Sequence, residues 1–164
     1  MSLNVLKGYY APMRYPSNWI ANIKMFFKTW RWAYQRAKRG YADIDVWNFD
    51  DYLTQVMENG IKQLANQSYS FPGDDEFPTA ESWTNYLNKI VNLLHSSRED
   101  TRTYTNIYEE DYDKWIETHG WNCDEDNPWR KAFWNREREL AALRQRDFDE
   151  AWEMIHHVFY HLWD

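Results

Sequence analysis

Apolar side chains recur along most of this chain at alternating steps of three and four residues, which places them on one face of an α-helix. The first such stretch covers residues 17–39, where Ser17 is a suitable N-cap and Gly40 stands at the position of a left-handed C-cap. This spacing predicts a helix over these residues, and the prolines before it predict an extended arm over residues 1–16. The apolar face of the helix consists of Ile20, Ile23, Phe27, Trp30, Tyr34 and Ala37.

A second apolar stripe of the same period follows directly. We expect this helix to open at Ala42 or Asp43, because the carboxylates of Asp43 and Asp45 would then lie favourably at its N-terminal dipole. The two helices should form an antiparallel hairpin over residues 17–65, with the chain reversing at Gly40. The stripe of the second helix consists of Val46, Phe49, Leu53, Val56, Met57, Gly60, Ile61 and Leu64.

A loop and a third helix come next. Residues 66–78 contain a Pro-Gly pair and clustered acids, which are typical of a loop. Thr79 is a suitable N-cap for a helix that should fade near Ser97. The apolar side chains of this third helix are Trp83, Tyr86, Leu87, Ile90, Val91 and Leu94.

The rest of the chain predicts one short helix and one long helical stretch. The short helix should cover about residues 105–118 and stop at Gly120. Asn127 followed by proline is a strong start signal, and nothing after it breaks a helix up to Asp164. The long stretch is therefore one helix or two, with the Arg146–Asp147 pair as the expected bend. Its buried side should consist of Phe148, Trp152, Ile155, Phe159 and Leu162.

These elements predict an all-α fold, an aromatic-rich bundle of four to six helices that starts with the N-terminal hairpin. The length of 164 residues suits a single helical domain over residues 1–164, in which residues 79–164 supply the remaining helices. Aromatic residues make up 19% of the chain, although the mean hydropathy is −0.90. Aromatic side chains should therefore replace aliphatic ones in much of the core, and some rings should reach the surface.

The only cysteine, Cys123, excludes an internal disulfide and a cluster of thiolate metal ligands. A reducing compartment is the simplest location for such a chain. No run approaches 18 apolar residues, and the N-terminus lacks the features of a signal peptide. We therefore expect the protein in the cytoplasm of a host cell, with no membrane partner.

Charge is distributed unevenly along the chain. The first 42 residues contain eight basic and no acidic side chains, whereas the remaining 122 contain 11 basic and all 26 acidic ones. On the first helix, Lys24, Lys28, Arg31, Gln35 and Lys38 fall within about 80° of arc, with Arg39 just beyond and Trp32 at the edge.

Two interpretations of this basic ridge stay open. It could bind phosphate groups while Trp32 stacks on a base, or it could be a solvated face that acids of the later helices neutralise. A membrane-surface helix is a third interpretation, which the acidic remainder of the chain disfavours. The candidate ligand-binding residues are Lys24, Lys28, Arg31, Trp32, Lys38 and Arg39.

Metal-binding and catalytic patterns are weak. Glu153, His157 and His161 follow one another at steps of four, and with a further ligand such as His119 or His95 they could hold zinc or iron. By helical projection they lie opposite the predicted buried side, so we interpret them as exposed polar side chains. No phosphate-binding glycine loop and no Ser/His/Asp or Cys/His pattern is present. The sequence therefore predicts no catalytic residue, no metal and no cofactor.

One stretch of the chain resembles a known group of proteins. Tyr34-Gln35-Arg36, Arg39-Gly40 and Asp43-Ile44-Asp45-Val46-Trp47 form a basic helix end, a turn and an Asp-x-Asp-x-Trp element. Together with the later Tyr69-Ser70-Phe71-Pro72 and Glu81-Ser82-Trp83, they resemble a widespread group of small uncharacterised bacteriophage and prophage proteins. The likeness covers roughly residues 16–95 and carries no known chemistry, and we expect Tyr34 and Trp47 to pack at a corner between two helices.

The combined observations favour a binding protein. We expect a non-enzymatic bacteriophage accessory protein of the host-takeover or anti-defence type, which binds and sequesters a host protein or an anionic, nucleotide-derived ligand. One alternative is a phage structural or assembly protein that acts through oligomerisation, and a homodimer is expected in either case. The other alternative is a metal-dependent hydrolase that uses Glu153, His157 and His161.

Overall fold

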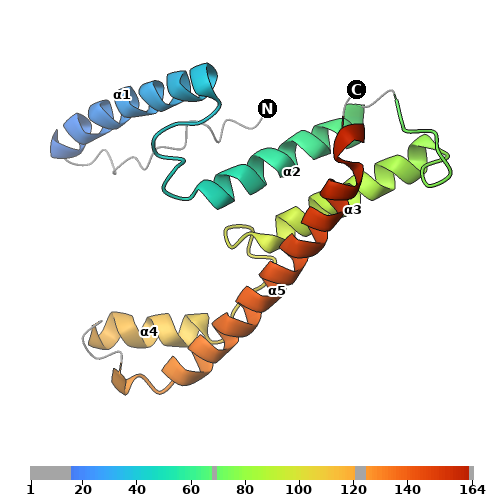
Figure 1. The fold of residues 1–164 in the computed structure, drawn as a ribbon. Coiled ribbons are helices and arrows are strands. Elements are labelled where there is room, and N and C mark those ends of the chain that lie inside the picture. The colour runs from blue at the N-terminus through green and yellow to red at the C-terminus, as the bar shows by residue number, and fades with distance from the viewer. Residues whose placement is uncertain (1–15, 68–69, 121–124, 163–164) are drawn as a thin grey trace. The chain divides into compact units, whose positions relative to one another are not determined.

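The computed structural model describes residues 16–67, 70–120 and 125–162. In these ranges the chain forms five α-helices and no β-strand, which confirms the all-α class (Figure 1). The predicted arm over residues 1–16 lies outside the described residues except for Pro16. The helices are α1 (Pro16–Arg39), α2 (Phe49–Gln67), α3 (Ala80–Ser97), α4 (Glu109–His119) and α5 (Arg130–Val158), and a 3-10 turn, η3 (Phe159–His161), follows α5.

The chain divides into two compact units, residues 1–52 and residues 53–164, with the boundary inside α2. The first unit contains α1 and the turns after it. The second contains most of α2 and all of α3, α4 and α5. The antiparallel arrangement of the first two helices stays a prediction.

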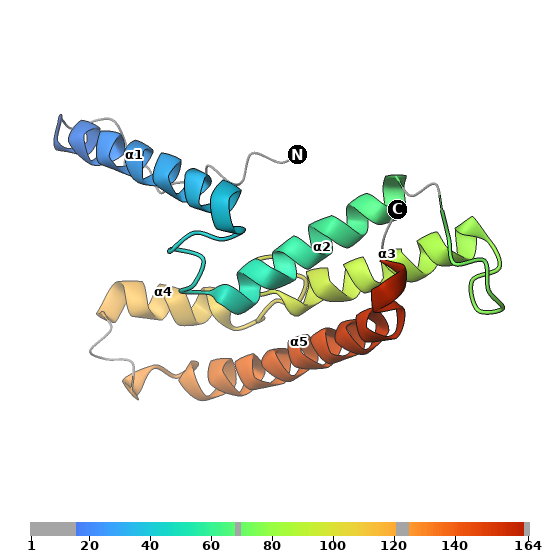
Figure 2. The same cartoon turned by 45° about the horizontal axis from the view of Figure 1, so that its top comes forward.

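The core of the second unit is formed where α3 packs along α5, side by side (Figure 2). The five apolar residues Trp83, Leu87, Ile90, Val91 and Leu94 of α3 are all buried, as their helical spacing predicts. From the other helices, the core receives Ile61, Ala151, Ile155 and Val158.

The start of α3 is fixed by the N-cap that the sequence predicts. The Thr79 hydroxyl accepts a hydrogen bond from the Ser82 amide, and the Ser82 hydroxyl accepts one from the Thr79 amide, at 3.1 and 3.3 Å. This reciprocal pair satisfies two donors at the helix end. Beside it, the Phe77 ring lies 5.0 Å from Trp83 and 4.9 Å from Tyr86, which confirms that aromatic rings build part of the core.

The last helix differs from its prediction in its buried face. Helix α5 is continuous from Arg130 to Val158, without an interruption at Arg146–Asp147. Of the side chains expected on its buried side, Ile155 is buried, but Trp152 is 51% and Phe159 is 60% exposed. The buried face was predicted from large apolar residues alone. The observed buried face also contains a small residue, Ala151, and a polar residue, Asp147. Its members are Leu140, Asp147, Ala151, Ile155 and Val158.

Helix α4 starts later than the sequence predicts, at Glu109, because Asn106 holds the preceding residues in a turn. The Asn106 side chain accepts a hydrogen bond from the Tyr108 amide at 3.0 Å and donates one to Glu137 at 2.8 Å. Gly120 ends the helix with a φ of +82°. Among the helices that the structure describes, none is both long and apolar enough to cross a bilayer.

Candidate binding surface on the first helix

The apolar stripe of α1 is exposed. Ile20, Ile23, Phe27, Trp30 and Tyr34 each leave between 59 and 67% of their surface open to solvent. The buried described side chains of this helix are polar instead, since Asn22 and Thr29 are buried and the Thr29 hydroxyl donates a hydrogen bond to the Met25 carbonyl at 2.9 Å. Contiguous exposed apolar surfaces of this kind often mark an interaction site.

The basic ridge lies beside this stripe and is divided into two parts. Lys24, Lys28 and Lys38 are exposed, and in the described part of the chain no ion pair involves any of them. Helix α1 contains no acidic side chain that could neutralise them. These three lysines are therefore available to an anionic partner.

In the other part of the ridge, the side chains of Arg31, Gln35 and Arg39 contact the carboxylate of Asp43. Arg39 forms an ion pair with the Asp43 carboxylate, Gln35 donates a hydrogen bond to it at 2.7 Å, and Arg31 approaches it at 3.5 Å. The Asp43 amide in turn donates to the Gln35 side chain at 3.0 Å. The hydrogen bonds from Arg39 and Gln35 lower the pKa of the Asp43 carboxyl, so this side chain stays ionised.

Asp45 stabilises the turn after α1 through a carboxylate that is more deeply buried than that of Asp43. Its side chain is only 5% exposed and accepts two hydrogen bonds from the Arg36 guanidinium, at 2.9 and 2.5 Å, and one from the Ala42 amide at 2.7 Å. Both aspartates were predicted to open the second helix, and this prediction is wrong. Residues 43–48 form turns, because the two carboxylates bind arginine side chains and a backbone amide before α2 begins at Phe49.

Gly40 completes this corner. Its φ of +85° lets the chain leave the helix, and its amide donates to the Arg36 carbonyl at 2.9 Å. The Tyr52 hydroxyl donates to the Gly40 carbonyl at 2.6 Å. These contacts account for the spacing of Gln35, Arg36, Arg39, Gly40, Asp43 and Asp45 along the chain. However, Tyr34 does not pack at the corner, and Trp47 is 88% exposed.

The predicted site residues therefore differ in what they can do. Lys24, Lys28 and Lys38 can bind an anion directly, whereas Arg31 and Arg39 can do so only by sharing or leaving Asp43. Arg39 also lies over the Tyr41 ring, with the guanidinium carbon 4.6 Å from the ring centre. The last predicted residue, Trp32, is only partly exposed on the same helix.

The possible metal ligands do not converge. Glu153, His157 and His161 are all exposed, and the His157 ring lies 2.8 Å from the Glu76 carboxylate. The further ligands considered from the sequence are used elsewhere, since His119 bonds the Trp115 carbonyl at 3.0 Å. Among the described residues, no group of three or more His, Cys, Asp or Glu side chains could hold a metal ion.

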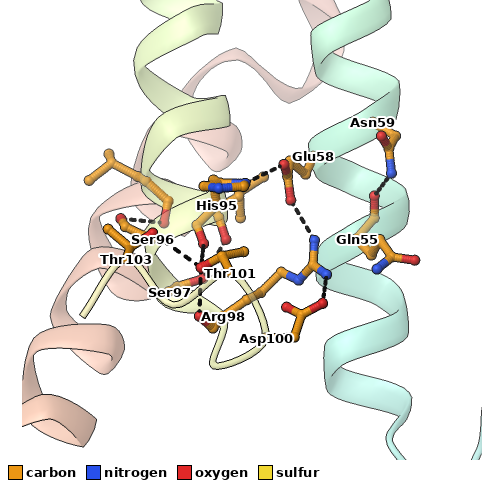
Figure 3. Close-up of polar contacts among 12 residues, drawn as sticks. Gln55, Glu58, Asn59, His95, Ser96, Ser97, Arg98, Asp100, Thr101 and Thr103 are labelled. Atoms are coloured by element: carbon orange, nitrogen blue, oxygen red, sulfur yellow. Dashed lines mark hydrogen bonds and ion pairs between the residues drawn. The ribbon is translucent and has the colours of Figure 1, made fainter. Parts of the chain in front are cut away.

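Two buried ionic clusters in the second unit were not predicted. The carboxylate of Glu58 on α2 binds the ring of His95, in the last turn of α3, at 2.9 Å (Figure 3). It also binds the guanidinium of Arg98, the residue that follows α3, at 2.7 Å. Arg98 also binds Asp100 at 2.6 Å. The only signal in the sequence is that Glu58 stands three residues before Ile61, on the side of α2 that becomes buried.

The second cluster surrounds Asp147 of α5. Its carboxylate accepts hydrogen bonds from the Ser96 hydroxyl at 2.7 Å, the Tyr104 hydroxyl at 2.5 Å and the Arg146 guanidinium at 2.8 Å. Burial raises the pKa of Asp147, but these hydrogen bonds outweigh it and the pKa is lowered. The hydrogen bonds from Ser96 and Tyr104 therefore join α3 and the loop after it to α5.

The chain matches no protein-family model, no curated protein and no solved structure. The geometry of the α1 surface is therefore the main guide to function.

Proposed function

We propose that the protein is a non-enzymatic bacteriophage accessory protein of the host-takeover or anti-defence type, which binds and sequesters an anionic host component through α1. The observation that carries this proposal is the exposed apolar stripe of α1 beside three exposed lysines, on a helix without acids. The assignment to bacteriophage rests on the resemblance of residues 16–95.

The chemistry of this surface favours a phosphate-bearing ligand with planar groups. Lys24 and Lys28 stand one helical turn apart, so their ammonium groups can meet the same phosphate-rich ligand. The exposed rings of Trp30 and Tyr34 offer stacking partners for a base. We therefore favour a nucleotide-derived anion or a single-stranded nucleic acid over a ligand without charge.

A calorimetric titration of the whole protein with nucleotides, cyclic dinucleotides and short single-stranded oligonucleotides tests this proposal. The double variant Lys24→Glu, Lys28→Glu should weaken binding at least tenfold, and higher salt should weaken wild-type binding. A matched control, Lys114→Glu with Lys131→Glu, makes the same charge change at exposed positions of the second unit. If no ligand binds, or if both double variants bind equally well, the proposal is wrong.

The exposed apolar stripe also favours a second function, that of a phage structural or assembly protein acting through oligomerisation. In that case α1 would meet other subunits through Phe27 and Trp30. Light scattering over a range of concentrations should then show an oligomer, which the double variant Phe27→Ser, Trp30→Ser would dissociate. A monomer at all concentrations would exclude this function.

A further inference from the structure

The second unit contains an apolar groove between α2 and the end of α5. Its volume is about 540 Å³, and its floor is formed by the buried side chains of Ile61 and Ile155. Met57 and Leu64 line one wall, and Trp152 and Phe159 line the other. The remaining lining residues are Gly60, Gln63, Gln67 and Leu162.

The dimensions of the groove suit a row of side chains. The lining spans residues 57–67 on one wall and 152–162 on the other, ten steps each, which corresponds to a length of about 15 Å. Apolar side chains at steps of three and four residues along one face of a helix can lie in a row over this length.

Large apolar side chains continue the groove at its edges. On α2, Leu53 and Val56 are exposed on the same side of the helix as Met57 and Gly60. On the α5 wall, Trp152 stacks on Phe148 with ring centres 6.1 Å apart and still leaves half of its surface open. Exposed aromatic side chains beside an apolar hollow are typical of the centre of a protein interface.

Gly60 adds an independent observation. It lies in the interior of α2, where glycine destabilises a helix by about 1 kcal/mol relative to alanine. No backbone or side-chain packing requires it, since a Cβ atom added there would meet no heavy atom within 4 Å. The missing side chain leaves room for another backbone to approach this wall of the groove closely.

Charge around the groove selects the partner. No lining side chain is charged, but Asp149 and Glu153 are exposed on α5 on the solvent side of Trp152. The unit as a whole, residues 53–164, contains 22 acidic and 11 basic side chains and thus has a net charge of −11. A cationic partner is therefore attracted to this unit, and an anionic one is repelled.

We propose that this groove docks a basic amphipathic helix of a partner protein. Apolar side chains of that helix, at steps of three and four residues, insert as a row over Ile61 and Ile155. Its backbone passes close to Gly60, and its lysine or arginine flank faces Asp149 and Glu153. This site is independent of the function proposed for α1, because it lies in the other unit and selects the opposite charge.

Three synthetic peptides test the docking directly by fluorescence anisotropy with the whole protein. The first is an 18-residue helix of leucine and lysine, with leucines at steps of three and four. The second replaces lysine with glutamate, and the third is a scramble of the first that keeps its charge. We expect the first peptide to bind at least tenfold more tightly than either of the others.

Substitutions on the two walls locate the binding. Gly60→Leu should fill the groove and weaken the leucine–lysine peptide at least tenfold while raising the melting temperature, because leucine is a better helix former. Asn59→Leu is the matched control, since it adds the same side chain at the neighbouring exposed position outside the groove. Glu153→Lys should weaken the peptide at least threefold, whereas Glu117→Lys on α4 should not.

Three results would overturn the proposal. Equal binding of the scrambled peptide would show attraction by charge alone, and unchanged binding to the Gly60→Leu variant would place the peptide elsewhere. The neutral dye Nile red tests whether the groove binds a small apolar molecule instead of a helix. If the dye binds wild type but not the Gly60→Leu variant, and the leucine–lysine peptide does not displace it, the groove is a site for small apolar molecules.

Discussion

Helices α1 and α3 have the same apolar period, yet only α3 is covered. Leu87, Ile90 and Leu94 of α3 are completely buried, whereas Ile23 and Phe27 of α1 are among the most exposed apolar side chains of the described chain. The difference lies in the partner, because α5 offers α3 a face with the small Ala151 at its centre. A periodic stripe therefore predicts which face of a helix is apolar, but not whether another element covers it.

The largest expected effect compares one residue from each stripe. Leu87→Ala opens a cavity in the core and should lower the free energy of unfolding by about 2–5 kcal/mol. Phe27→Ala removes a larger side chain but should change it by less than about 0.5 kcal/mol, because that ring is already in solvent. Urea unfolding measures the free energy of unfolding of both variants, provided that its dependence on urea concentration (the m-value) stays the same as in wild type. Equal losses would show that the α1 stripe is covered in solution.

Breaking a buried ion pair of the second unit should cost more stability than breaking an exposed ion pair of the first. The Arg98 and Glu58 side chains are only 9 and 11% exposed, so Arg98→Met leaves a buried carboxylate short of a partner and should cost about 3 kcal/mol. Arg39→Met breaks the exposed pair with Asp43 and should leave the unfolding midpoint nearly unchanged. The single variant Glu58→Gln and the double variant Glu58→Gln, Arg98→Met complete a double-mutant cycle. A coupling free energy near zero between the two positions would contradict a stabilising interaction in this buried pair.

The sequence predicts the helices better than it predicts their partners. Spacing and end signals are local, so the bounds of α3 and the C-terminal ends of α1 and α4, at Gly40 and Gly120, agree with the structure within about two residues. The start of α2 was wrong because Asp43 and Asp45 resemble first-turn acids. Their carboxylates instead bind arginine side chains up to 12 residues earlier, and a local pattern cannot show this choice.

The candidate site was predicted only in part for the same reason. The apolar stripe and the exposed Lys24 and Lys28 follow from helical projection. Helical projection does not predict that Asp43 binds Arg31. It also does not predict the burial of Glu58 and Asp147, because these carboxylates bind Arg98 and Tyr104, which lie 40 and 43 residues away along the chain. The groove beside Gly60 was invisible in the sequence because its two walls are about 90 residues apart.

Acid should weaken the second unit through Asp147. Its pKa is lowered in the folded protein, so its stabilising effect is complete above the ordinary carboxyl pKa of about 4 and is lost as the pH falls through the lower, folded-state value. Asp147→Asn should cost roughly 1–3 kcal/mol at pH 7 and should lose less further stability than wild type between pH 5 and pH 2. Ser96→Ala removes one hydrogen bond to Asp147, and its loss of stability between pH 5 and pH 2 should lie between those of wild type and Asp147→Asn. Equal losses over this pH range in all three proteins would rule out a role of Asp147 in the acid response.

The smallest effect compares the two residues that the sequence singles out as N-caps. Thr79→Ala removes the hydroxyl that accepts the Ser82 amide, and it should lower the free energy of unfolding by about 1 kcal/mol. Ser17 lies inside α1, after Pro16, so Ser17→Ala should not destabilise the protein, because alanine is the better residue within a helix. Thermal unfolding followed by circular dichroism measures both variants. A loss at Ser17 equal to that at Thr79 would mean that α1 begins two residues later, at Asn18, and that its first turn depends on a cap, as α3 does.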